Sequence, residues 1–245
     1  ADGQNAASGT LLVAGAVVRI GFVRDTARLA AGANKLFVGE EFATADGSSF
    51  SNTHPFTIND LTIATTIGAG ELDAFAPGTS LTGLSLRNDS TNLVPSNSPW
   101  PSADKLFANW FLQLSSSLTP VGGMLSDIES NVDTDVVEVY DAPLLIPANS
   151  MLPNPDGWSV GRPSPFSLVV PFQRPYEYRG GDVFMLNRTS GHGQIESVAV
   201  DTNTNPRLQS AWFNDSNTDS VNLPATPLVH RFNADAAVIV PNDRA

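Results

Sequence analysis

A short-range alternation of apolar and polar residues constrains this sequence more than any other feature. In the segment 56–67, Leu61, Ile63 and Ile67 share one parity, and threonines fill much of the other. Successive side chains of a β-strand point to opposite faces, so the spacing predicts a half-buried strand. Similar runs recur along the chain between breaks that contain Gly and Pro. This pattern predicts many short strands joined by turns.

The segment 106–114 has two interpretations. Its even positions are apolar, as on one face of a strand. Leu106, Trp110 and Leu114 also stand four residues apart, and Ser102 is a residue type that caps helices. We expect a strand here, and a short helix is the alternative.

Further strands are expected where Val, Ile, Leu, Phe and Thr concentrate, namely in residues 10–23, 35–38, 81–87, 135–140, 143–147, 165–172, 182–188, 195–201, 207–213, 226–232 and 235–240. Residues 25–31 form the main helical candidate. With so little helix to connect parallel neighbours, the strands must form antiparallel sheets stacked face to face. The predicted fold is all-β: an antiparallel β-sandwich, jelly-roll-like, with long Pro- and Asn-rich loops, built as a single domain from residues 1–245.

Composition narrows the classes of function. The chain of 245 residues has no cysteine, which excludes disulfides, thiolate nucleophiles, zinc–thiolate centres and iron–sulfur clusters. Its formal net charge of -12 would repel nucleic-acid phosphates and anionic lipids, so neither is an expected partner. Its apolar runs fall short of the roughly 18 residues that span a bilayer, so we expect no membrane insertion.

One segment carries a resemblance to known proteins. Residues 165–191 hold an aromatic-rich strand pattern that leads through Gly180-Gly181-Asp182 into an amphipathic strand pattern. This arrangement resembles a stretch of uncharacterised secreted bacterial β-sandwich proteins. Many of those proteins carry a short C-terminal sorting anchor, whereas residues 238–245 contain neither an apolar helix nor a basic tail. The resemblance implies an extracellular β-sandwich and assigns no functional residue.

Sequence gives little support for catalysis. The histidines show no metal-ligand spacing, and no Gly-x-Ser-x-Gly nucleophile motif accompanies them. Paired carboxylates for glycoside hydrolysis would leave no sequence signature, so glutamates in or beside strands deserve inspection. The residues considered are His54, His192, His230, Glu138, Glu177 and Glu196. We expect a protein that is not an enzyme.

Three stretches place oxygen-bearing side chains at alternate positions, as a loop around a hard cation does: residues 131–135, 201–205 and 215–219. None completes an EF-hand, because the required Gly and bidentate Glu are replaced. Asx turns in solvated loops are the other interpretation. Calcium is the one cofactor suggested, and its predicted ligands are Asp201, Asn203, Asp215, Asn217 and Asp219.

Three tryptophans lie in or beside loops rich in Pro, Asn and Asp: Trp100, Trp158 and Trp212. Exposed rings at such places would form a stacking platform for sugars, whereas buried rings would be lids on the core. Both interpretations stay open, and carbohydrate is therefore an expected partner beside copies of the chain itself.

The ends of the chain bear on assembly. Residues 10–23 are the most apolar stretch, and residues 236–240 close the chain in a similar way. Such strands pair within one sandwich, or residues 1–23 form an exchanged or edge strand in a neighbouring subunit. We expect a self-assembling structural protein, such as a virion capsid or coat subunit or an extracellular filament or surface-layer subunit. The alternative is a secreted carbohydrate- or calcium-binding module.

Overall fold

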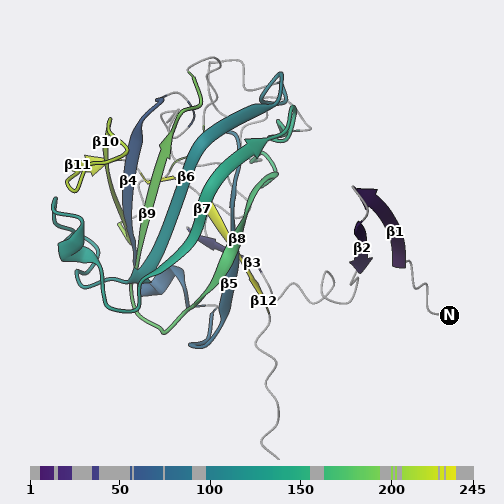
Figure 1. Cartoon of the computed structure of the whole chain (residues 1–245). Helices are drawn as coiled ribbons and strands as arrows, with labels where there is room; N and C mark the ends of the chain where they lie inside the picture. The colour runs from purple at the N-terminus through teal and green to yellow at the C-terminus, as the bar shows by residue number, and fades with distance from the viewer. Residues whose placement is uncertain are drawn as a thin grey trace, which may run out of the picture. The chain divides into compact units, whose positions relative to one another are not determined.

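The computed structural model describes the greater part of the chain (Figure 1), namely residues 6–13, 16–23, 35–38, 56, 58–73, 75–89, 98–154, 163–193, 200, 202, 206–225, 227, 228 and 230–235. The chain divides into two compact units, residues 1–34 and residues 35–245. Among the described residues, no helix is long and apolar enough to cross a membrane.

The first unit is a β-hairpin. Strand β1 (Ala6–Val13) pairs antiparallel with β2 (Ala16–Val23) along its whole length. The strand structure expected in residues 10–23 is therefore present, divided into two strands. Two residues separate the strands, and such short connections are the commonest way to join antiparallel neighbours.

The second unit contains two antiparallel sheets. The larger sheet has six strands, in the spatial order β11 (Asn222–Ala225), β10 (Leu208–Phe213), β4 (Leu61–Ile67), β9 (Val183–Ser190), β6 (Lys105–Ser116) and β7 (Val137–Ile146). The smaller sheet has four strands, in the order β3 (Lys35–Val38), β12 (His230–Asp235), β5 (Ser80–Leu86) and β8 (Leu168–Glu177). Figure 1 shows β4, β9, β6 and β7 side by side across the larger sheet.

The strand order is that of a jelly roll. The order β3-β12-β5-β8 in one sheet faces β4-β9-β6-β7 in the other, and β10 and β11 extend the larger sheet beyond β4. The predicted all-β, jelly-roll-like sandwich is thus confirmed. The described helices are two short 3-10 turns, η2 (Ala69–Glu71) and η3 (Glu129–Asn131).

Several strand boundaries differ from the prediction. The strands expected at 135–140 and 143–147 form one strand, β7, because Pro143 lies at the sheet edge, where its missing N–H costs no ladder bond. Strand β11 was not predicted. The helical candidate 25–31, most of 195–201 and residues 236–240 lie outside the described residues.

The core lies between the two sheets. It is built from inner-face side chains of both, with an aromatic group in which Phe56 lies 4.8 Å from Trp100 and Phe107 lies 4.9 Å from Trp110, measured between ring centroids. Burying this apolar surface is the main stabilising contribution. Fully buried members include Phe56, Ile67, Leu81, Phe107, Trp110, Leu112, Leu114, Val170 and Phe232.

Strand β4 is buried on both faces, so the prediction of a half-buried strand is wrong. A second apolar cluster covers the outer face of the larger sheet. Loop residues Met124, Ile128 and Val221 pack there against Phe184 and other residues of the sheet. Two of the three threonines of β4 have partners for their hydroxyls. Thr65 Oγ1 lies 2.8 Å from Ser210 Oγ, and Thr62 Oγ1 donates to the main-chain oxygen of Asp215 at 2.6 Å.

Residues 106–114 lie within strand β6, so the helical alternative is wrong. The simple alternation also fails there. Phe107 and Trp110 both face the core, because their partners on β7 are Leu144 and Ala142 and one extra residue is inserted in β6. This β-bulge leaves Leu106 55% exposed, although its parity matches that of Trp110.

Candidate functional site

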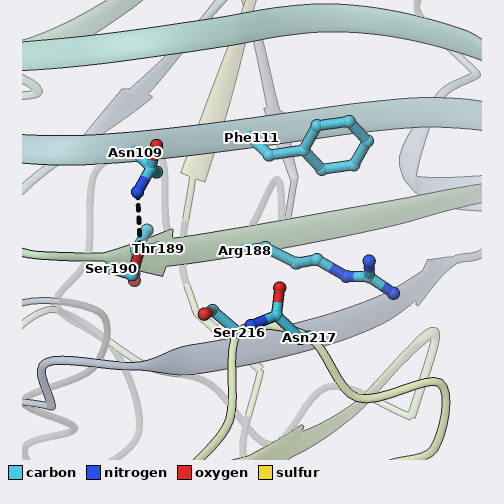
Figure 2. Close-up of a pocket in the computed structure, with 7 residues that line it drawn as sticks. All are labelled: Asn109, Phe111, Arg188, Thr189, Ser190, Ser216 and Asn217. Carbon is cyan, nitrogen blue, oxygen red and sulfur yellow. Dashed lines mark hydrogen bonds between the residues drawn. The ribbon is translucent and has the colours of Figure 1, made fainter.

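A hollow of about 350 Å³ opens on the outer face of the larger sheet, on the far side from the core. Figure 2 shows the side chains that line it. The hollow is lined by Asn109, Phe111, Arg188, Thr189, Ser190, Ser216 and Asn217. These residues come from β6, from β9 and from the loop that follows β10.

Cross-strand pairing sets the floor of the hollow. Asn109 stands opposite Ser190, and Phe111 stands opposite Arg188, in the antiparallel register of β6 and β9. The Asn109 side-chain amide donates a hydrogen bond to Ser190 Oγ at 3.0 Å. The bulge in β6 lies next to this pair, so the bulge helps to set the direction of Asn109.

Two side chains of the sheet hold the loop that forms the other wall. Thr62 Oγ1 donates to the main-chain oxygen of Asp215 at 2.6 Å, and Arg188 Nη2 donates to that of Thr218 at 2.9 Å. Thr62 and Arg188 are partners in the β4–β9 ladder. Main-chain anchoring on both sides of Ser216 and Asn217 therefore positions these two residues over the sheet.

The charge of the hollow is nearly balanced. Arg188 Nη2 lies 3.5 Å from Asp219 Oδ1. The Asp219 side chain is 83% exposed, so solvent weakens this pair. The arginine therefore acts mainly as a donor to the loop, with a carboxylate beside it.

Three of the predicted calcium ligands lie among the described residues, namely Asp215, Asn217 and Asp219 in the loop 215–219. Asp215 Oδ1 accepts a hydrogen bond from the main-chain nitrogen of Asn217 at 2.8 Å, which is an Asx turn. Asp219 lies beside Arg188, an unfavourable neighbour for a cation. Asp201 and Asn203 lie outside the described residues. Calcium binding at this loop stays a prediction, which the melting temperature with and without millimolar calcium would test.

In the third calcium-like stretch, 131–135, two side chains are anchored to residues outside the stretch, those of Asn131 and Asp135. Asn131 is 1% exposed, and its carboxamide bonds to Thr119 Oγ1 at 2.8 Å and to main-chain atoms of Leu125 and Asp127 at 2.8–2.9 Å. It organises the loop that covers the outer apolar cluster.

Asp135 is the second of these anchored side chains. Its carboxylate accepts hydrogen bonds from the Ser116 main-chain nitrogen at 2.8 Å and from the Tyr176 hydroxyl at 3.1 Å. Burial, with a smaller effect of Asp135, raises the pKa of Tyr176, so this hydroxyl keeps its proton and donates. In the described part of the chain, no group of three or more acidic or histidine side chains is placed to hold a metal ion.

The positions of the described tryptophan rings give little support to the predicted stacking platform. Trp100 is 4% exposed and packs on Phe56 in the core. Its burial contradicts the expectation of an exposed stacking ring. Trp212 is half-buried on β10, and Trp158 lies outside the described residues.

Both described histidines are buried. The ring nitrogens of His192 lie 2.7 Å from the Ile58 oxygen and 2.9 Å from the Gly193 oxygen. The Nδ1–H of His230 donates to the Leu228 oxygen at 3.0 Å, and burial lowers the pKa of this ring from 6.5 to about 4. Main-chain oxygens thus engage both rings.

The other residues considered for catalysis do not join the hollow. Glu138 and Glu177 are exposed on β7 and β8. His54 and Glu196 lie outside the described residues.

Sequence reasoning missed most of the residues that line the hollow, apart from Asn217. Asn109, Ser190 and Ser216 are common polar residues that stand far apart in the chain. The available signal was the outward parity of polar residues on β6 and β9, which does not indicate which strands are neighbours.

Searches against protein-family models, curated proteins and solved structures give no match.

Proposed function

We propose that the protein is a non-catalytic structural subunit that self-assembles with copies of itself into an extracellular layer, filament or shell, as capsid and coat subunits do. The proposal rests on the hairpin of residues 6–23. A two-stranded hairpin by itself is marginally stable in water, so it favours packing on another surface.

The register of the hairpin supports the proposed contact with a partner. Directly opposed residues share a face of an antiparallel ribbon, and every second position repeats that face. One set of positions carries only apolar residues and glycine, namely Ala7, Gly9, Leu11, Val13, Ala16, Val18, Ile20 and Phe22. The other set mixes the polar residues Ser8, Thr10 and Arg19 with apolar residues and glycine, namely Ala6, Leu12, Val17, Gly21 and Val23. A face without polar side chains favours packing against protein.

Two features of the sandwich favour association of copies through a face of a sheet instead of pairing at edge strands β7 and β8. Pro143 lies in edge strand β7, and Pro171 and Pro175 lie in edge strand β8, where proline limits further strand pairing. Leu106 and Leu145 are cross-strand partners and are 55% and 54% exposed. They offer apolar surface to a neighbouring copy.

Matched charge variants of the hairpin test the proposal. Val18→Asp places a carboxylate at a position of the apolar set, and Thr10→Asp places the same charge in the other set, opposite Arg19. We expect shells or filaments of the natural chain in negative-stain microscopy. Val18→Asp should give folded monomers with an unchanged melting temperature, whereas Thr10→Asp should still assemble.

Three results would contradict this proposal. A natural chain that stays a monodisperse monomer at high concentration removes self-assembly. Assembly that survives Val18→Asp shows that the hairpin is not the contact. Loss of the folded sandwich in Val18→Asp shows that the hairpin stabilises its own molecule instead of a neighbour.

A further inference from the structure

The hollow between β6, β9 and the loop after β10 has the chemical groups of a binding site for hydroxyl-rich molecules. Asn109 and Asn217 contribute carboxamides, and Ser190 and Ser216 contribute hydroxyls. Each of these groups both donates and accepts hydrogen bonds, as sugar hydroxyls do. In the part of the chain that the structure describes, the Asn109 amide donates to Ser190 Oγ, while Asn109 Oδ1 and the Ser190 hydroxyl hydrogen have no protein partner.

An aromatic ring stands beside these polar groups. Phe111 is half-buried on β6, opposite Arg188 on β9, and Figure 2 shows the two side chains next to each other on these neighbouring strands. A ring of this kind offers an apolar surface to the C–H face of a sugar, and the polar groups around it fix the orientation. The site therefore combines an apolar contact with directional hydrogen bonds.

The charges around the hollow disfavour an anionic ligand. Arg188 already donates to the Thr218 oxygen and lies 3.5 Å from the Asp219 carboxylate. Asp215 lies in the same loop, and the chain as a whole carries a net charge of -12. We propose that this hollow binds a neutral saccharide through Asn109, Phe111, Ser190 and Asn217.

The hollow is formed before any ligand binds. Thr62 and Arg188 hold the loop by its main chain, so Ser216 and Asn217 need little ordering when a sugar enters. A volume of about 350 Å³ lies near the lower limit for ligand sites and suits a short saccharide end. The inference is independent of assembly, because all of these contacts lie within one sandwich.

Glycan-array binding followed by calorimetry tests the site. The full chain is applied to an array of neutral glucose-, galactose-, mannose- and N-acetylhexosamine-terminated glycans together with uronate-containing glycans. The strongest neutral glycan is then titrated into each variant. We expect Asn109→Ala and Asn217→Ala each to weaken binding about tenfold, as the loss of one good hydrogen bond does.

Two further variants sharpen the test. Phe111→Leu keeps an apolar side chain against the outer cluster but removes the ring, and it should also weaken binding. Asn222→Ala, at an exposed position of β11 outside the hollow, is the matched control and should bind as the natural chain does. Melting temperatures check that each variant is folded.

A silent array would overturn the inference, as would binding confined to uronate-containing glycans. Equal affinities for Asn109→Ala, Asn217→Ala and the Asn222→Ala control would place any sugar elsewhere and would also overturn it. Repeating the titration with Val18→Asp separates the two proposals, because a monomeric variant should keep its saccharide affinity.

Discussion

At the scale of single residues, main-chain atoms hold two of the buried polar side chains, those of Asn131 and His230. Asn131 bonds to main-chain atoms of its own loop, and His230 donates to the Leu228 oxygen. His230 is 1% exposed, and its Nε2 has no partner among the described residues. A neutral ring is tolerated there, but an imidazolium would lack the solvation that it needs.

This environment predicts a loss of stability in acid. Burial lowers the pKa of His230 from 6.5 to about 4 in the folded protein. Below pH 6.5 the unfolded chain takes up a proton that the folded chain refuses until about pH 4. The contribution of His230 is therefore complete above pH 6.5 and is lost as the pH falls toward 4, by about 3 kcal/mol.

Urea unfolding at several pH values measures the effect. His230→Gln keeps a donor for the Leu228 oxygen but does not titrate, so carboxylates elsewhere contribute equally to both proteins. Acidification should therefore lower the unfolding free energy of the natural chain more than that of the variant. Parallel curves would show that His230 is not the responsible group.

At the scale of elements, the bulge of β6 lies in close contact with Gly191, the residue that follows β9. Gly191 has a φ of +73°, and a Cβ added there would lie 2.6 Å from the Cβ of Ala108, a residue of the bulge. Ala108 has no flexible side chain that could move aside. A larger residue at position 191 must therefore displace the strand itself, next to Asn109 and the hollow.

We expect Gly191→Ala to destabilise the protein by about 3 kcal/mol, through both backbone strain and overlap. Gly181→Ala is the control, because its φ of +81° is similar but nothing lies within 4 Å of the added Cβ. It should cost about 1 kcal/mol, from strain alone. Thermal unfolding gives both values.

A second substitution checks the assigned contact. Ala108→Gly should recover part of the stability lost in Gly191→Ala, because it removes the atom with which the new methyl overlaps. Equal destabilisation by Gly191→Ala and Gly181→Ala, or no recovery in the double variant, would assign the cost to strain only.

At the scale of the whole molecule, charge opposes the proposed assembly. Each subunit carries a net charge of -12, so neighbouring copies repel one another. The proposed contact is apolar and does not depend on opposite charges. Added salt should therefore favour assembly by screening the repulsion.

Sedimentation velocity measures this dependence. Raising sodium chloride from about 0.02 to 0.5 M shortens the screening length severalfold, and we expect the assembled fraction to rise. A fall in the assembled fraction with salt would show that pairing of opposite charges holds the subunits together. Val18→Asp serves as the monomeric reference throughout.

Much of the fold follows from local pattern. The strands near 35–38, 81–87, 182–188 and 207–213 are all present, because period-two alternation and β-branched residues act through the strand itself. The scarcity of helix then leaves antiparallel sheets as the arrangement that satisfies the backbone. These features depend on neighbours in the sequence.

Other features depend on partners that are distant in the chain. Strand β4 is buried on its outer face by residues 124, 128 and 221, which its own alternation cannot reveal. The bulge in β6 moves Leu106 to the surface because its partner strand is one residue shorter over that stretch.

The sequence by itself determined an all-β sandwich without cysteine chemistry and with a strongly apolar N-terminal segment, because composition and alternation are properties of the local chain. Only the tertiary structure decided that this segment is a hairpin and that Trp100 belongs to the core. It also decided that Asn109, Phe111, Arg188 and Asn217 surround one hollow. The physical reason is that strand register and loop anchoring place side chains beside one another regardless of their separation in sequence.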